Sequence, residues 1–160
     1  MLNINIICVG KLKEEYLKNA IKEYSKRLGK YCSINMIEIP DERLPDKIND
    51  STIAQTKDAE GKKILAQLKK DSYHIILDLD GKELDSVEFS KKIESITVNG
   101  YSAIDFIIGG TLGLSDEVKK EADFAISFSK LTFPHQLIRV FLLEQIFRAF
   151  KIINNETYHW

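Results

Sequence analysis

The chain has 160 residues and a mass of 18.3 kDa, enough for one domain whose core needs no disulfides. Hydrophobic residues make up 44% and charged residues 29%, and the formal net charge of −1 argues against a general nucleic-acid binder. No apolar run is long enough for a membrane span, no signal peptide precedes the first predicted strand, and the two cysteines form no framework, so we expect a cytoplasmic protein with reduced thiols.

The first half of the chain alternates strand and helix. Residues 3–9 are apolar and β-branched and predict a strand. Residues 14–28 repeat apolar side chains at helical spacing and predict an amphipathic helix. The remaining predictions are a strand over 33–39, a polar loop over 40–49 and a long helix over 51–70.

The second half continues the alternation. Residues 73–79 predict a third strand that ends at the turn pair Asp80 and Gly81. The remaining predictions are a helix over 86–98, a strand over 103–108, a short helix over 116–121, a strand over 124–128 and a last helix over 135–153. Strands that alternate with helices imply an α/β fold with a parallel sheet and helices on both faces, here as a single domain over residues 1–160.

A glycine-rich loop over residues 109–114 follows the fourth predicted strand. Open α/β sheets bind small ligands at such strand ends. The glycine spacing matches neither the dinucleotide fingerprint nor the P-loop, and the next helix opens with Asp116 and Glu117, which would repel a phosphate. The loop therefore favours a neutral or cationic ligand. The alternative is a tight strand-to-helix turn without a ligand.

A second loop, residues 128–133, follows the fifth predicted strand. Phe128 and Phe133 flank Ser129, Lys130 and Thr132. Hydroxyls and backbone amides between aromatic side chains suit a flat heterocycle such as adenine. The alternative is that both phenylalanines belong to the core.

The last predicted helix carries an arginine on its apolar side. On a helical wheel, the side chains that share a face with Arg139 are Leu142, Leu143, Ile146, Phe150 and Ile153. A buried guanidinium requires a carboxylate, carbonyls or a substrate as partner, unless it escapes to solvent at the helix start. The helix is too apolar for the surface of a monomer, so either the core or a second copy covers it, and we expect a homodimer.

Histidines and lysines supply further candidates. His135 stands one helical turn before Arg139, which makes it a candidate functional residue. The three histidines are scattered, so we expect no metal site. Lys18, Lys22 and Lys26 form one stripe on the first helix, which is either a solvated face or a contact surface for phosphates.

Several motifs together resemble one known family. They are Val9-Gly10-Lys11-Leu12-Lys13, Ile108-Gly109-Gly110, Gly113-Leu114, the string from Ser127 to Gln136 (SFSKLTFPHQ), the helix with Arg139, Glu144, Gln145, Arg148 and Ala149, and the ending Tyr158-His159. This pattern, which runs nearly end to end, resembles the RlmH family. These are bacterial large-subunit ribosomal RNA pseudouridine N3-methyltransferases of the SPOUT superfamily.

The resemblance implies a SPOUT-type fold with a C-terminal trefoil knot over roughly residues 73–160, a homodimer and S-adenosylmethionine as cofactor. It implies methylation of N3 of a pseudouridine in 23S ribosomal RNA, in the helix 69 stem-loop of the assembled ribosome. The alternative is a knotted RNA-binding protein that has lost catalysis.

The resemblance also implies roles for single residues. The cofactor would be held by Leu77, Gly109, Phe128, Ser129, Lys130, Leu131, Thr132 and Phe133. His135 would relay a proton or orient the substrate, and Arg139 would pair with a phosphate or stabilise the imide anion. The RNA would be contacted by Arg139, Tyr158, His159, Lys18 and Lys22. Trp160 departs from the basic residue with which this family usually ends, which puts a terminal phosphate contact in doubt.

Overall fold

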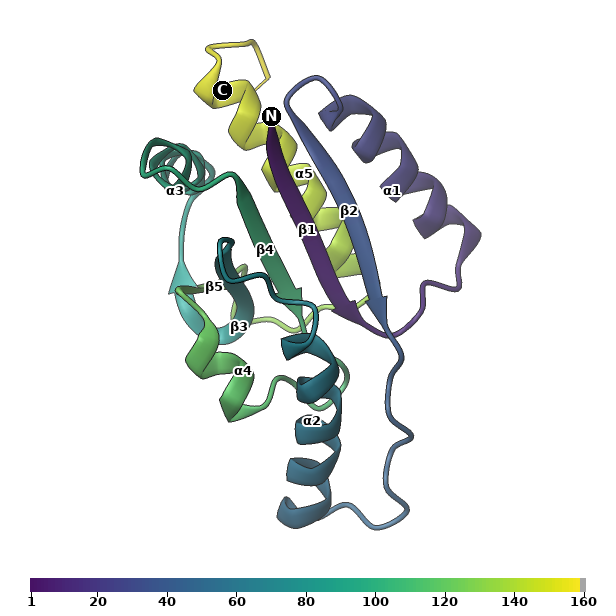
Figure 1. The fold of residues 1–160 in the computed structure, drawn as a ribbon. Helices are drawn as coiled ribbons and strands as arrows, with labels where there is room; N and C mark the ends of the chain where they lie inside the picture. Colours follow the sequence, from purple (N-terminus) through teal and green to yellow (C-terminus); the bar gives the residue numbers. More distant parts are fainter. Residues whose placement is uncertain (159–160) are drawn as a thin grey trace.

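A five-stranded parallel sheet forms the centre of the molecule (Figure 1). The computed structural model of the chain describes residues 1–158. The strand order is β2-β1-β4-β3-β5, and every pairing is parallel. The strands are β1 (Leu2–Val9), β2 (Cys32–Ile39), β3 (Tyr73–Glu83), β4 (Ala103–Ile108) and β5 (Phe124–Ser127). The predicted α/β class and the parallel sheet are confirmed.

Helices cover both faces of the sheet, as predicted. They are α1 (Glu15–Leu28), α2 (Asp50–Leu65), α3 (Ser86–Val98), α4 (Asp116–Glu121) and α5 (Leu137–Ile153). Alternate side chains of β1 point to opposite faces, so Ile6 packs with α1, α3 and α5, whereas Ile7 packs with α2 and α4. The larger core lies on the α5 face.

Helix α5 is covered largely by its own chain. It packs between α1 and α3, and its inward side chains are buried in a single protomer. The apolar character of this helix therefore no longer requires a second copy, because the core accounts for most of it. Phe141 remains 39% exposed.

Two predicted elements end several residues away from where the structure ends them. Helix α2 ends at Leu65 instead of residue 70, and β3 continues past the predicted turn. Leu77 and Lys82 both pair with Ile126, so residues 78–81 bulge out between them. A Cβ on Gly81 would lie 2.7 Å from the carbonyl carbon of Ile126, which explains the glycine. Asp80 and Gly81 thus form a bulge within the strand instead of ending it.

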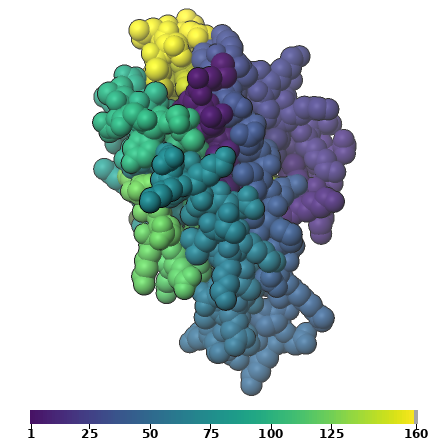
Figure 2. Space-filling model, in the orientation of Figure 1, coloured from purple at the N-terminus to yellow at the C-terminus, as the bar shows by residue number. Residues whose placement is uncertain are grey.

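All five strands run in the same direction, so their carboxyl ends meet at one edge of the sheet. The loops after β3, β4 and β5 gather there, and α2 with its preceding loop projects beyond that edge (Figures 1 and 2). This edge is where a ligand site is expected in a parallel α/β sheet.

Candidate functional site

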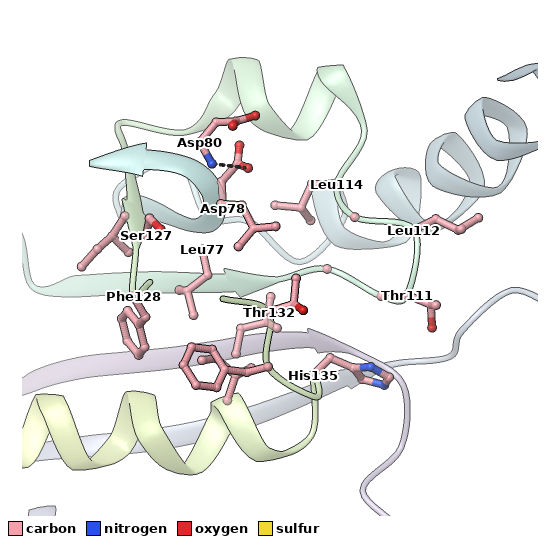
Figure 3. Close-up of a pocket in the computed structure, with 18 of the residues that line it drawn as sticks. Leu77, Asp78, Asp80, Thr111, Leu112, Leu114, Ser127, Phe128, Thr132 and His135 are labelled. Carbon is pink, nitrogen blue, oxygen red and sulfur yellow. Dashed lines mark hydrogen bonds between the residues drawn. The ribbon is translucent and has the colours of Figure 1, made fainter. Parts of the chain in front are cut away.

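A cavity of about 570 Å³ opens at the carboxyl edge of the sheet, between the ends of β3, β4 and β5 (Figure 3). This volume lies within the range of sites that hold cofactor-sized ligands. Leu77 and Thr132 stand in its middle, with Phe128 toward one end and His135 toward the other. Two loops distant in sequence, after β4 and after β5, therefore form one site, as the sequence predicted.

The predicted cofactor residues are nearly all brought together. Those that line the cavity are Leu77, Gly109, Phe128, Ser129, Leu131, Thr132 and Phe133. Lys130 does not line it, and its side chain is exposed. Ile108, Ile126 and Ile138 add apolar walls. The cavity therefore combines apolar surfaces with a few hydroxyls and backbone amides, which suits a flat heterocycle.

The glycine loop forms the tight turn considered for it and also lines the cavity. Gly110 and Gly113 pair across a tight turn, and Gly113 adopts φ +90, which side-chain-bearing residues rarely do. A Cβ on Gly109 would lie 3.0 Å from the backbone of Gly113. The loop is thus a sterically demanding turn, and the same residues line the cavity.

An acidic rim was not foreseen from the sequence. Asp78 and Asp80 line the cavity from the bulge in β3, and Lys119 Nζ lies 3.5 Å from Asp78 Oδ2. The sequence prediction ended the third strand at residue 79 and named neither aspartate as a site residue, so the bulge that brings both to the cavity was missed. Lys57 and Lys119 also line the cavity and balance the two carboxylates in number, but Asp80 forms no ion pair within residues 1–158 and can therefore meet a cationic group of a ligand.

His135 lies half-buried at the end of the cavity away from Phe128. A Cβ on Gly10 would lie 3.4 Å from its Nε2 atom, so the ring sits against the end of β1. Burial lowers the pKa of His135 below its usual value, and the nearby Arg139 charge lowers it further. The imidazole is therefore neutral at pH 7 and able to accept a proton.

Arg139 meets the partners predicted for a buried guanidinium. Its side chain is 0% exposed, Nη1 donates to Glu38 Oε2 at 3.0 Å, and Nη2 donates to the Gly10 carbonyl at 2.8 Å. The predicted direct contact of Arg139 with a phosphate does not fit this arrangement, because no part of the side chain reaches the surface. The other role predicted for Arg139, stabilisation of the imide anion, stays a prediction.

The other predicted RNA-binding residues lie away from the cavity. Lys18 and Lys22 are exposed on α1, which packs near β2, at the opposite edge of the sheet from β5. Tyr158 donates to Glu144 and packs edge-on against Phe147 at the far end of α5. The cavity of the same protomer is therefore out of its reach. His159 lies outside the described residues.

Within residues 1–158, no cluster of three or more metal-ligating side chains occurs, and no helix is long and apolar enough to cross a membrane. Burial raises the pKa of Cys8 to about 11 and that of Cys32 to about 12, so both thiols are protonated at neutral pH.

A parallel α/β sheet with a cavity built from strand-end loops is typical of α/β proteins that bind a small ligand or cofactor at this edge. Comparison with known proteins narrows this class. Residues 2–159 match the family described as predicted SPOUT methyltransferase. Proteins named ribosomal RNA large subunit methyltransferase H, from Clostridium perfringens and Clostridioides difficile, are 56% and 52% identical to this chain, each over 99% of both sequences. The chain belongs to the SPOUT methyltransferases and, among them, to the RlmH family.

A solved structure supports the fold independently. A probable methylase family protein from Haemophilus influenzae Rd KW20 aligns over 98% of this chain and 70% of its own, with a TM-score of 0.55 and 14% identity. At that identity, the likeness concerns the fold alone.

Proposed function

We propose that this protein uses S-adenosylmethionine to methylate N3 of a pseudouridine in 23S ribosomal RNA, in the helix 69 stem-loop of the assembled ribosome. The observation that carries this proposal is the cavity at the strand ends. Its lining includes the glycine loop and the loop after β5, which hold two of the motifs that the chain shares with its family. The relatives' name, ribosomal RNA large subunit methyltransferase, supports the substrate class.

The residues of the cavity fit this cofactor. Apolar walls around Leu77, Ile126 and Phe128 suit the adenine ring, and Asp78 and Asp80 suit the cationic sulfonium and ammonium groups. The volume of about 570 Å³ is adequate for a molecule of this size. When bound, S-adenosylmethionine supplies an activated methyl group to the base.

The chain's own residues would position the base and manage one proton. Neutral His135 accepts the N3 proton as the nitrogen becomes nucleophilic, or orients the base for this loss. Arg139 holds the carboxyl ends of β1 and β2 together beneath His135, and its positive charge helps to keep the imidazole neutral. Most of the rate then comes from placing the reacting atoms about 3–3.5 Å apart.

The proposal extends to assembly. A second copy would bring Tyr158 and His159 to the cavity, since Tyr158 is far from the cavity of its own protomer. Lys18 and Lys22 would contact RNA phosphates from α1. A trefoil knot in the region 73–160 and a cytoplasmic location also belong to this proposal.

The first test is mass mapping of ribosomal RNA from cells with and without this gene, followed by methyl transfer in vitro. We expect ribosomal RNA from cells without the gene to lack one methyl group at the target pseudouridine. The purified protein should add this methyl group in vitro. A non-catalytic RNA-binding protein would leave the RNA mass unchanged and would need no affinity for S-adenosylmethionine in calorimetry.

Replacement of His135 tests the proton step. We expect His135→Gln to lower the single-turnover rate by about 10²–10⁴-fold. Because the pKa of His135 is lowered from 6.5, the wild-type rate should be level above about pH 6.5 and fall as pH drops through the lowered pKa. The variant should lack this acidic limb. A wild-type rate retained by His135→Gln would remove His135 from the mechanism.

A further inference from the structure

A second, smaller cavity adjoins the proposed cofactor site. It encloses about 150 Å³ and shares Gly110, Thr111, Leu112 and His135 with the larger cavity. The remaining lining residues are Val9, Asp41, Glu42, Arg43, Leu44, Thr56 and Glu60. The two spaces are thus separated only by the glycine loop and the one histidine that the mechanism uses.

Glu60 is the unusual group in this second cavity. It comes from α2, is only 5% exposed, and its Oε2 atom accepts a hydrogen bond from the Glu42 amide at 3.0 Å. Within residues 1–158, Oε1 has no hydrogen-bond partner, although a carboxylate oxygen can accept two. Oε1 is not among the fully buried unpaired atoms, so it faces the open space of the cavity and not the protein interior. This oxygen is therefore available to a ligand.

Glu60 and His135 reach the second cavity from different elements. A Cβ on Gly110, at the end of β4, would lie 3.1 Å from Glu60 Oε1, whereas a Cβ on Gly10, at the end of β1, would lie 3.4 Å from His135 Nε2. The strands β1 and β4 are neighbours, with Cys8 paired to Ile108. Glu60 comes from α2 and His135 from the loop just before α5, and both line the same small space.

The size and charge of this space restrict its ligand. Its volume equals that of about five water molecules, which suits one six-membered ring and excludes a whole nucleotide. Three acidic residues, Asp41, Glu42 and Glu60, line it against one arginine, Arg43, and this excess of acidic groups is unfavourable for a phosphate. A neutral ring with N–H donors on its edge fits both conditions.

We propose that the second cavity receives the target base and that Glu60 accepts a hydrogen bond from its N1–H group, a proposal that rests on the proposed function. The ribose of pseudouridine is attached through carbon, so N1–H and N3–H are both free. In uridine, N1 carries the ribose and offers no donor. With N3 directed to His135 and the cofactor, N1–H meets Glu60, which becomes the residue that selects pseudouridine over uridine.

The test compares two targets and two variants. Large-subunit RNA in ribosomes is prepared with pseudouridine or with uridine at the target position, and single-turnover methylation is measured at saturating S-adenosylmethionine. Glu60→Met removes the acceptor at similar length and should slow methylation of pseudouridine by at least about 10-fold, with the uridine rate changed less than about 2-fold. Glu60→Gln keeps an oxygen acceptor and should recover part of the loss.

The matched control is Asp58→Asn, an exposed carboxylate of the same helix, which should leave both rates unchanged. Calorimetry should show the same affinity for S-adenosylmethionine in all variants. Equal losses on both targets, or weaker cofactor binding, would assign Glu60 a structural role and overturn the proposal. Equal wild-type rates on both targets would overturn it as well.

A wild-type experiment removes the dependence on variants that fold poorly. N1-methylpseudouridine at the target position lacks the N1 donor but keeps N3–H, and we expect it to react at least about 10-fold more slowly than pseudouridine. A rate equal to that of pseudouridine would refute the role of Glu60. Failure of the wild type on every target would instead refute the proposed function.

Discussion

Four polar side chains form a row across the sheet at paired positions of β2, β1, β4 and β3. Asn35 donates to Asn5 at 3.1 Å, Asn5 donates to Asp105 at 2.7 Å, and His74 Nδ1 lies 3.1 Å from Asp105 Oδ2. Asp105 is 1% exposed, so its interaction with His74 is little screened by solvent. The row ties together the ends of the strands opposite the cavity.

This row predicts a pH-dependent stability. The interaction with Asp105 raises the pKa of His74 above 6.5, so the charged pair contributes fully below about pH 6.5 and is lost as pH rises through the raised pKa. Urea unfolding should show His74→Asn to cost roughly 1 kcal/mol more at about pH 5.5 than at about pH 8.5. In an Asp105→Asn background the difference should vanish. A cost independent of pH would contradict the charged pair.

A second residue-scale prediction concerns Glu38. Its Oε2 atom accepts from the Leu12 amide at 2.6 Å and from Arg139 at 3.0 Å. Glu38→Ala would leave a fully buried guanidinium without a counter-charge, at an expected cost of about 3 kcal/mol. Denaturant unfolding measures this, with the exposed Glu94→Ala as control, expected within about 0.5 kcal/mol of wild type. A cost below about 1 kcal/mol would mean that the carbonyls of Val9 and Gly10 alone stabilise the buried guanidinium.

The elements could be predicted to a large extent, because their signals are local. Apolar periodicity located all five helices and five strands of the described residues, and the alternation gave the parallel sheet. The bulge at residues 78–81 was missed because it depends on the pairing of Lys82 with Ile126, a contact distant in sequence. The burial of Glu60 was equally hidden, since it arises only when α2 lies over Gly110.

The bulge gives a prediction at the scale of an element. Gly81→Ala places a methyl group 2.7–2.9 Å from backbone atoms of Ala125 and Ile126, so β3 and β5 must separate. We expect a loss of about 1–3 kcal/mol in stability and weaker binding of S-adenosylmethionine, because Asp78 and Asp80 lie on the displaced segment. Gly29→Ala is the control, since Gly29 has helical φ −57 at an exposed helix end. An unchanged affinity of Gly81→Ala for S-adenosylmethionine would show that the bulge does not contribute to cofactor binding.

At the scale of the whole molecule, the site and the exposed apolar surface adjoin each other. Leu131 is 73% exposed and Phe133 38% exposed on the loop that lines the cavity, and Phe133 contacts Phe141 of α5 edge-on at 5.4 Å. Exposed apolar groups that cluster in this way mark interaction surfaces. A second copy seated here would close the cavity and would add the side chains that one protomer cannot supply.

This surface predicts the oligomeric state. Sedimentation analysis of the wild type should give about twice the 18.3 kDa of one chain, as expected for the symmetric dimer that is the commonest assembly. Phe141→Glu should shift the protein to a monomer and abolish methyl transfer, because it places a charge in the apolar contact. Val98→Glu, at a 78% exposed position at the end of α3, should remain a dimer. A monomeric wild type, or a dimer indifferent to Phe141→Glu, would exclude this surface as the interface, and the tail of a partner could then not reach the site by this route.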